Sequence, residues 1–111
     1  MKYNMKLNNE PFNLIKSGTK TVELRLNDEK RKLLNIGDKI EFTNITNGEK
    51  LSVDIISLHK YPSFEELYKH FDKVDMGYNK DDIAEPKDME AYYSKEEQDK
   101  YGVLGIEIRK K

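Results

Sequence analysis

Short runs in which apolar and polar residues alternate are the feature that most constrains the fold of this chain. Such alternation is typical of β-strands with one buried face, because successive side chains point to opposite sides of a sheet. The runs that we interpret as strands are residues 2–7, 21–26, 39–44, 51–58 and 103–108. The fourth run loses its alternation at Ile56. Asn47-Gly48 before it is a strong hairpin signal, which predicts that the third and fourth strands pair.

Helix signals lie between these runs. Pro11 stands where a helix can begin, and Gly18 is a suitable C-terminal stop. Ser63 with Glu66, and Ser94 with Glu97, have the spacing of capping boxes and predict two later helices. About five strands with helices in the connections predict an α+β fold, arranged as a small mixed barrel.

The length of 111 residues fits one domain, and we expect residues 1–111 to form it. The chain has no cysteine, which excludes disulfides, thiolate metal sites and cysteine nucleophiles. His59 and His70 lack the spacing of a metal site, so we expect no metal and no cofactor. No segment is apolar enough to suggest a signal peptide or a membrane span, so we expect a cytoplasmic protein without membrane partners.

The net charge of −1 conceals an asymmetry along the chain. Residues 1–60 carry 11 lysines and arginines against 8 acids, and residues 61–111 carry 9 against 13. A uniformly basic surface for nucleic acid is therefore absent, and a polyanion would have to meet the first half. The acidic run over residues 72–90 lacks EF-hand spacing, and we interpret it as a solvated face.

Residues 18–25 read GTKTVELR and are the candidate functional segment. In one interpretation Lys20 and Arg25 are cationic anchors oriented by Glu23. In the other, Glu23 and Arg25 form an ordinary surface ion pair, worth under about 1 kcal/mol. Strand geometry would send Lys20 and Glu23 to opposite faces, so they can meet only if Lys20 lies in the loop before the strand or a bulge intervenes.

This GxKxxExR octet, together with residues 26–31, 36–42 and 101–106, resembles the ASCH family, and the resemblance covers nearly the whole chain. It implies a PUA-like β-barrel of about five to six strands, with a cleft lined by the signature residues. It also implies RNA or a nucleoside or nucleotide as the ligand. Some small bacterial members are amidohydrolases that deacetylate 4-acetylcytidine with the signature lysine, a threonine three residues later and a separate glutamate.

Lys20 matches the catalytic lysine of those hydrolases, but Glu23 stands where they have threonine. A carboxylate beside a lysine favours the charged ammonium, which is a poor base but a good anchor for phosphate or a carbonyl oxygen. We therefore favour a binding module over an amidohydrolase acting on an acylated nucleoside. If the protein is an enzyme, Lys20 and Glu23 would be catalytic, with Glu23 activating water. Asp75 and Glu85 are the candidates for a third acid.

The expected ligand-binding set is a cationic cleft around the signature. Its residues are Lys20, Glu23, Arg25, Lys30, Arg31 and Tyr93. Lys30 and Arg31 would extend the positive edge towards a phosphate backbone. Tyr93 would stack on a base, although core packing of one ring of Tyr92-Tyr93 is the simpler interpretation. A third possibility is a protein-interaction domain that uses the acidic second half of the chain.

Overall fold

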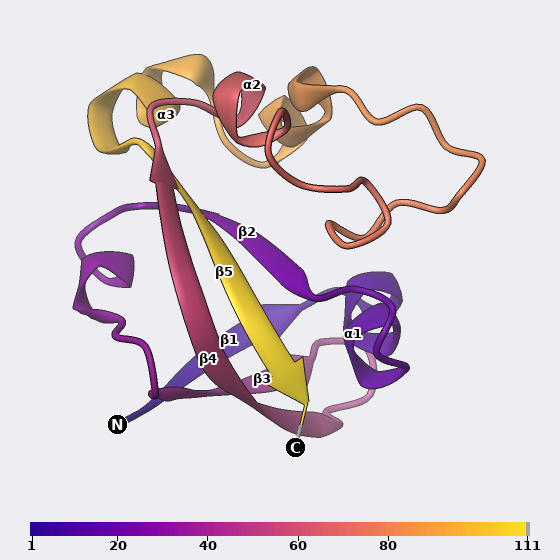
Figure 1. The fold of residues 1–111 in the computed structure, drawn as a ribbon. Coiled ribbons are helices and arrows are strands. Elements are labelled where there is room, and N and C mark those ends of the chain that lie inside the picture. Colours follow the sequence, from indigo (N-terminus) through magenta and orange to yellow (C-terminus); the bar gives the residue numbers. More distant parts are fainter. Residues whose placement is uncertain (111) are drawn as a thin grey trace.

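The computed structural model describes residues 1–110 and confirms an α+β fold with five strands (Figure 1). The strands are β1 (Lys2–Leu7), β2 (Val22–Leu26), β3 (Lys39–Asn44), β4 (Lys50–Tyr61) and β5 (Val103–Lys110). The α-helices are α1 (Asn9–Lys16), α2 (Phe64–Leu67) and α3 (Lys95–Tyr101). Two 3₁₀ helices, η1 (Arg31–Leu33) and η2 (Pro86–Ala91), lie in the connections. No helix within residues 1–110 is long and apolar enough to cross a membrane.

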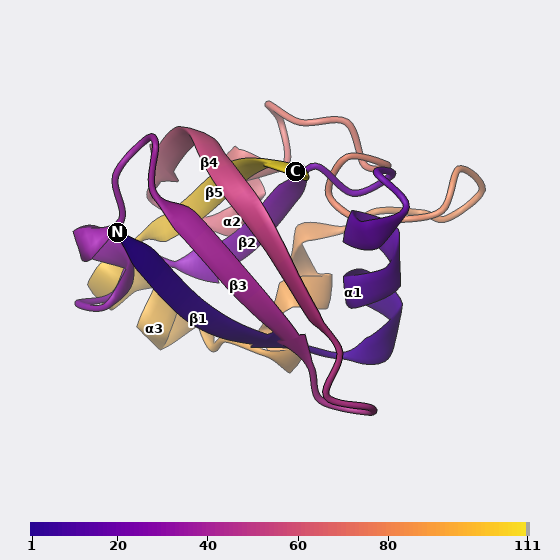
Figure 2. The ribbon, with the colours of Figure 1, turned by 90° about the horizontal axis from the view of Figure 1, so that it is seen from below.

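The five strands form one curved sheet in the order β1-β3-β4-β5-β2. β1 runs parallel to β3, and the other neighbours are antiparallel (Figure 2). β1 and β2 are the two edges, and no strand pairing joins them within the described part of the chain. The sheet is therefore a half-barrel, open between its first and second strands.

The long strand β4 confirms the expected irregularity at Ile56. Its register against β5 shifts between Ile55 and Ser57, so the extra residue forms a bulge. Beyond the bulge β4 continues to Tyr61, three residues past the expected end, and pairs there with Val103. The bulge lets β4 bend, so that it pairs with β3 at one end and with β5 along most of its length.

Two hydrophobic clusters lie on opposite faces of the sheet. The inner cluster includes Phe42, Ile106 and the α1 residue Phe12, all with 0 % exposure. The outer cluster is formed by side chains of β2 and β5 against α2, with Phe64 and Leu67 also at 0 %. β2 and β5 are therefore covered on both faces, and the expectation that β2 is a half-buried strand is wrong. The second face is covered by residues 62–102. The alternation of residues within a strand does not reveal where such a distant segment lies.

Capping residues begin the later helices as their spacing predicts. The Ser63 hydroxyl oxygen accepts the Glu66 amide at 3.2 Å, and the Ser94 hydroxyl oxygen accepts the Glu97 amide at 3.1 Å. Between α2 and η2 the chain is irregular and forms the long loop that extends beyond α1 in Figure 1.

The turn after α1 delivers the chain to the signature. Gly18 has a φ of +85°, and its amide donates to the Ile15 carbonyl at 3.0 Å, which ends the helix as expected. The amides of Thr19 and Lys20 then both donate to the Leu14 carbonyl at 3.0 Å. Lys20 is thereby fixed in the turn, two residues before β2 begins.

We predict that Asn44→Ala lowers the free energy of unfolding by about 1–3 kcal/mol, because it removes a fully buried side chain together with its two hydrogen bonds. Asn44 is fully buried; its amide nitrogen donates to Asn9 Oδ1 at 2.9 Å, and its Oδ1 accepts the Thr46 amide at 2.9 Å. Urea unfolding measures the change, with Asn79→Ala at an exposed position as the control. Equal stability of the two variants would contradict this role for Asn44.

Candidate functional site

A cavity of about 700 Å³ lies beside the open edge of the half-barrel. β1, α1 and β2 contribute one part of its wall, and residues between Tyr68 and Tyr93 contribute the other. Four residues of the octet line it: Leu24 and the three charged residues of the signature, Lys20, Glu23 and Arg25. The structure therefore brings the signature side chains to one shared pocket.

Lys20 meets Glu23 in the way that strand geometry requires. It lies in the turn before β2, outside the alternation of the strand, and its ammonium is 2.9 Å from Glu23 Oε1. The two side chains are only 9 % and 5 % exposed. The pair is therefore a buried ion pair, not the surface pair of the simpler interpretation.

Arg25 binds the other oxygen of Glu23 and spans the gap in the sheet. Its Nε and Nη2 atoms each lie 2.8 Å from Glu23 Oε2. Nη2 also donates to the Lys6 carbonyl of β1 at 3.0 Å. Glu23 and Arg25 lie opposite Ile106 and Leu104 of β5, so they point to the inner face of the sheet. A guanidinium thus links β2 to β1 where strand pairing is absent.

The two cations keep Glu23 ionised despite its burial. Burial alone would raise the pKa of its carboxyl, but Lys20 and then Arg25 outweigh that effect and hold the pKa below its ordinary value. Burial would likewise lower the pKa of Arg25, and Glu23 reverses this, so the pKa is raised. The network therefore carries two positive charges and one negative charge.

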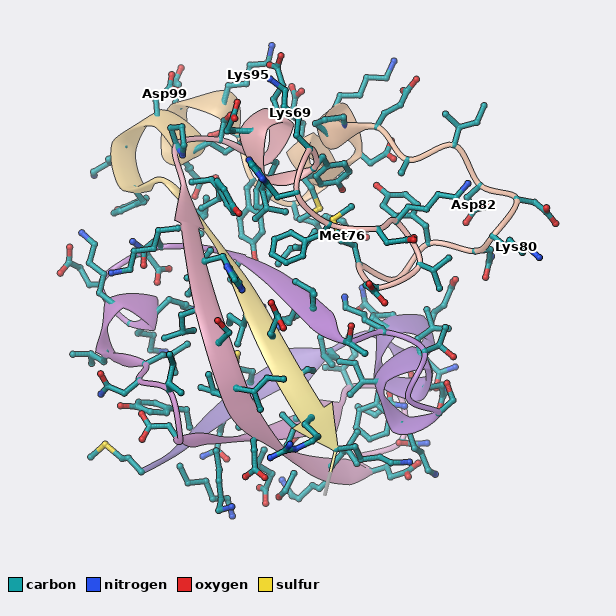
Figure 3. All side chains as sticks on the ribbon, in the orientation of Figure 1. Lys69, Met76, Lys80, Asp82, Lys95 and Asp99 are labelled. Carbon is teal, nitrogen blue, oxygen red and sulfur yellow. The ribbon has the colours of Figure 1, made fainter. Side chains whose placement is uncertain are left out.

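Residues 75–77 cover Lys20. The Asp75 carbonyl accepts the amides of both Thr21 and Val22 at 2.9 Å, which fixes the loop against the start of β2. Gly77 then passes directly over the lysine: a Cβ atom there would lie 3.0 Å from Lys20 Cδ. Figure 3 labels the neighbouring Met76 on this loop, above β2. The acidic run over residues 72–90 contains no local signal for this contact of Gly77 with Lys20.

The other expected binding residues divide between the cavity and its surroundings. Tyr93 lines the cavity while its ring also stacks on Phe64, with centroids 5.9 Å apart, so it serves the core and the wall together. Burial raises the pKa of Tyr93, against the opposing effect of Arg25. Lys30 is exposed, Arg31 pairs with Asp28 at 3.4 Å, and neither lines the cavity.

The acids at the cavity are not those that sequence reasoning selected. Asp75 contributes its backbone carbonyl, and Glu85 lies on a different hollow of the surface. The carboxylates that line the cavity besides Glu23 are Glu10, Asp82 and Asp88.

The charge of the cavity is mixed. Its cations are Lys6, Lys20 and Arg25, which face four carboxylates. The expectation of a cationic cleft is therefore wrong, because the long loop and η2 bring acids of the supposed solvated face to the wall. Within residues 1–110 no group of three potential ligands could hold a metal ion. His59 instead pairs with Glu107 at 2.6 Å, and His70 stacks on Tyr61.

We predict that Gly77→Ala displaces the Lys20 side chain, because the new Cβ atom would contact it and the φ of +109° disfavours any side chain. Gly48→Ala is a matched control: its φ is +77°, but a Cβ atom there meets nothing within 4 Å. Both variants should lose about 1–2 kcal/mol of stability from backbone strain. Only Gly77→Ala should shift the side-chain NMR resonances of Lys20, and an unchanged Lys20 would refute the contact.

We predict that Arg25→Lys costs about 1–3 kcal/mol of unfolding free energy, because an ammonium cannot reproduce the planar fork that reaches both Glu23 and the Lys6 carbonyl. Arg109→Lys, on the exposed end of β5, should be close to neutral. Urea denaturation of both variants checks this. A neutral Arg25→Lys would show that the bridge between β2 and β1 contributes nothing.

Comparison with known proteins identifies the family. The family model described as "ASCH domain" matches residues 5–111. The crystal structure of hypothetical protein PH0355 superposes with a TM-score of 0.84, at 32 % identity over 100 % of both chains. The NMR structure of protein PF0455 from Pyrococcus furiosus has a TM-score of 0.77, at 34 % identity over 99 % of this chain and 97 % of that one.

A more distant structure agrees on the fold. The ASCH domain from Lactobacillus crispatus JV V101 has a TM-score of 0.64, at 14 % identity over 98 % of this chain and 79 % of that one. No curated protein matches the sequence. The family model matches almost the whole chain, and the structure is a PUA-like half-barrel. This chain therefore belongs to the ASCH domain family.

Proposed function

We propose that this ASCH domain binds a nucleobase-containing ligand, either a free nucleotide or a nucleotide of an RNA chain, in the cavity beside β2. The observation that carries the proposal is the Glu23 carboxylate, which is buried, kept ionised by two cations and placed on the cavity wall. A buried charge is costly, and a network of this kind is commonly a functional site.

The network offers the hydrogen-bond partners that a base edge needs. Each carboxylate oxygen of Glu23 can accept more than one hydrogen bond, so it can take an exocyclic amine or a ring N–H in addition to its cations. The Lys20 ammonium has three donors, of which one is used by Glu23. The remaining donors suit a base carbonyl or a phosphate oxygen. Donors and acceptors side by side distinguish bases by their edges.

The size and mixed charge of the cavity favour a base over a bare polyanion. A volume of about 700 Å³ lies within the range of small-molecule sites, roughly 300–1,000 Å³. Tyr92 and Tyr93 add aromatic surface on which a base can stack. The acids on the wall would repel a string of phosphates. Lys30 and Arg31, outside the cavity, are the candidates for contacts to an RNA backbone.

The amidohydrolase alternative receives less support from this geometry. A lysine base must reach the proton that it removes, whereas the Lys20 side chain is held in a buried ion pair with Glu23 at 2.9 Å. Glu23 as a base is weakened in turn, because both of its oxygens accept from cations and its pKa is lowered. We expect incubation with 4-acetylcytidine to release no cytidine. Release that Lys20→Ala and Glu23→Ala abolish would reinstate the hydrolase.

Calorimetric titration with CMP, UMP, AMP, GMP and a single-stranded RNA tests the proposal. We expect at least one mononucleotide to bind, and Lys20→Ala to weaken it roughly 10- to 100-fold through loss of a charged hydrogen bond. Lys60→Ala, at an exposed position on β4, is the control. Binding that is absent from the wild type, or unaffected by Lys20→Ala in a folded variant, would overturn the proposal.

The same titration separates a free nucleotide from RNA. If RNA is the ligand, the double variant Lys30→Ala with Arg31→Ala should bind the RNA more weakly and with a smaller salt dependence. Its affinity for the mononucleotide should be unchanged. Equal RNA affinity of this variant and the wild type would remove both residues from the site.

A further inference from the structure

A second polar network lines the same cavity and contains no residue of the signature. Its members are Tyr68, which follows α2, Tyr78 on the long loop, and Asp88 in η2. The two phenolic oxygens are 2.8 Å apart, and Tyr78 Oη is 2.8 Å from Asp88 Oδ2. Three separate segments of the cavity wall thus meet in one hydrogen-bonded chain.

Counting hydrogens fixes the direction of this chain. Three oxygens form two contacts, and each contact needs one hydrogen between its oxygens. An ionised carboxylate can only accept, so the Tyr78 hydroxyl donates to Asp88. The single hydrogen of Tyr78 is then used, and the hydrogen between the two tyrosines comes from Tyr68. The Tyr68 oxygen is left with lone pairs and no free hydrogen.

The surroundings hold this arrangement in place. Asp88 Oδ2 also accepts the Glu85 amide at 3.2 Å, which fixes the carboxylate at the start of η2. The two tyrosine rings pack edge to face, with centroids 6.1 Å apart. Burial raises the pKa of Tyr68, although its bond to Tyr78 opposes this; burial and then hydrogen bonding raise the pKa of Tyr78. Both hydroxyls therefore keep their hydrogens.

We propose that Tyr68 is a specificity-determining residue whose hydroxyl oxygen only accepts from the ligand, with Tyr78 and Asp88 as the positioning residues. This inference rests on the proposed function and narrows its ligand. The group that faces Tyr68 must carry an N–H or O–H donor, and Glu23 offers a second acceptor on the other part of the cavity wall. The class of ligand that satisfies both is a nucleoside with an exocyclic amine or ring N–H and a second donor, such as a ribose hydroxyl.

The direction of the chain is measurable without any ligand. In protein labelled on tyrosine, the hydroxyl proton of Tyr68 should show a nuclear Overhauser effect to the ring protons of Tyr78 that flank its oxygen. The hydroxyl proton of Tyr78 should show none to the ring of Tyr68. The reverse pattern would overturn the proposal, whatever the protein binds.

The recognition role is measured by titrating the same four mononucleotides and the same single-stranded RNA into Tyr68→Phe and Tyr78→Phe. Loss of one neutral hydrogen bond should weaken the tightest ligand roughly fivefold in Tyr68→Phe. Tyr78→Phe frees the Tyr68 hydrogen, so ligands that present an acceptor should bind better to this variant, relative to the other ligands, than they do to the wild type. The differences in affinity among the four bases should therefore become smaller. Tyr3→Phe is the control, because its hydroxyl donates to the Leu33 carbonyl and does not line the cavity.

The outcomes separate this inference from the function on which it rests. Wild-type affinity in Tyr68→Phe, together with weakened binding in Lys20→Ala, would overturn the role of Tyr68 and leave the proposed function standing. No binding of the mononucleotides or the RNA to the wild type would overturn both. Weakened binding in Tyr68→Phe with the narrowed preference in Tyr78→Phe is the result that the hydrogen count predicts.

Discussion

The buried carboxylate of Glu23 is the interaction on which the rest of the structure depends. It lies on an edge strand of an open half-barrel, where the missing pairing between β1 and β2 would otherwise leave backbone groups unsatisfied. Arg25 binds it and reaches the Lys6 carbonyl of β1. Lys20 binds its other oxygen from the turn after α1. One anion therefore holds together two edge strands and the helix that connects them.

This arrangement also explains why the open edge is a site and not merely a defect. Direct pairing of β1 with β2 would close the barrel and bury the wall of the cavity. The side chains of Glu23 and Arg25 instead link the two strands and leave the cavity open. Burying three charges is expensive, and an apolar replacement would often be no less stable. The long loop also holds the network in place, since Gly77 covers Lys20 and the Asp75 carbonyl binds the start of β2. An open edge and a charged network that is fixed in position are both features that a binding site requires.

Much of the fold could be predicted because its signals are local. Alternation marks the strands, Ile56 marks the bulge, and Ser63 and Ser94 mark helix starts. Strand parity even set the condition under which Lys20 meets Glu23. The role of Gly77 and the network of Tyr68, Tyr78 and Asp88 depend instead on how an irregular loop folds back on the sheet. Contacts so distant in sequence leave no periodic pattern. For the same reason the sequence predicts a cationic cleft, whereas the cavity has mixed charge.

The pKa of Glu23 tests the central claim most directly. Its carboxyl carbon can be followed by NMR through an acid titration of the folded protein. The structure predicts a pKa below the ordinary value of 4.5, because two cations outweigh the effect of burial. A pKa at or above 4.5 would mean that Lys20 and Arg25 do not hold the carboxylate, and would contradict both the architecture of the open edge and the site built upon it.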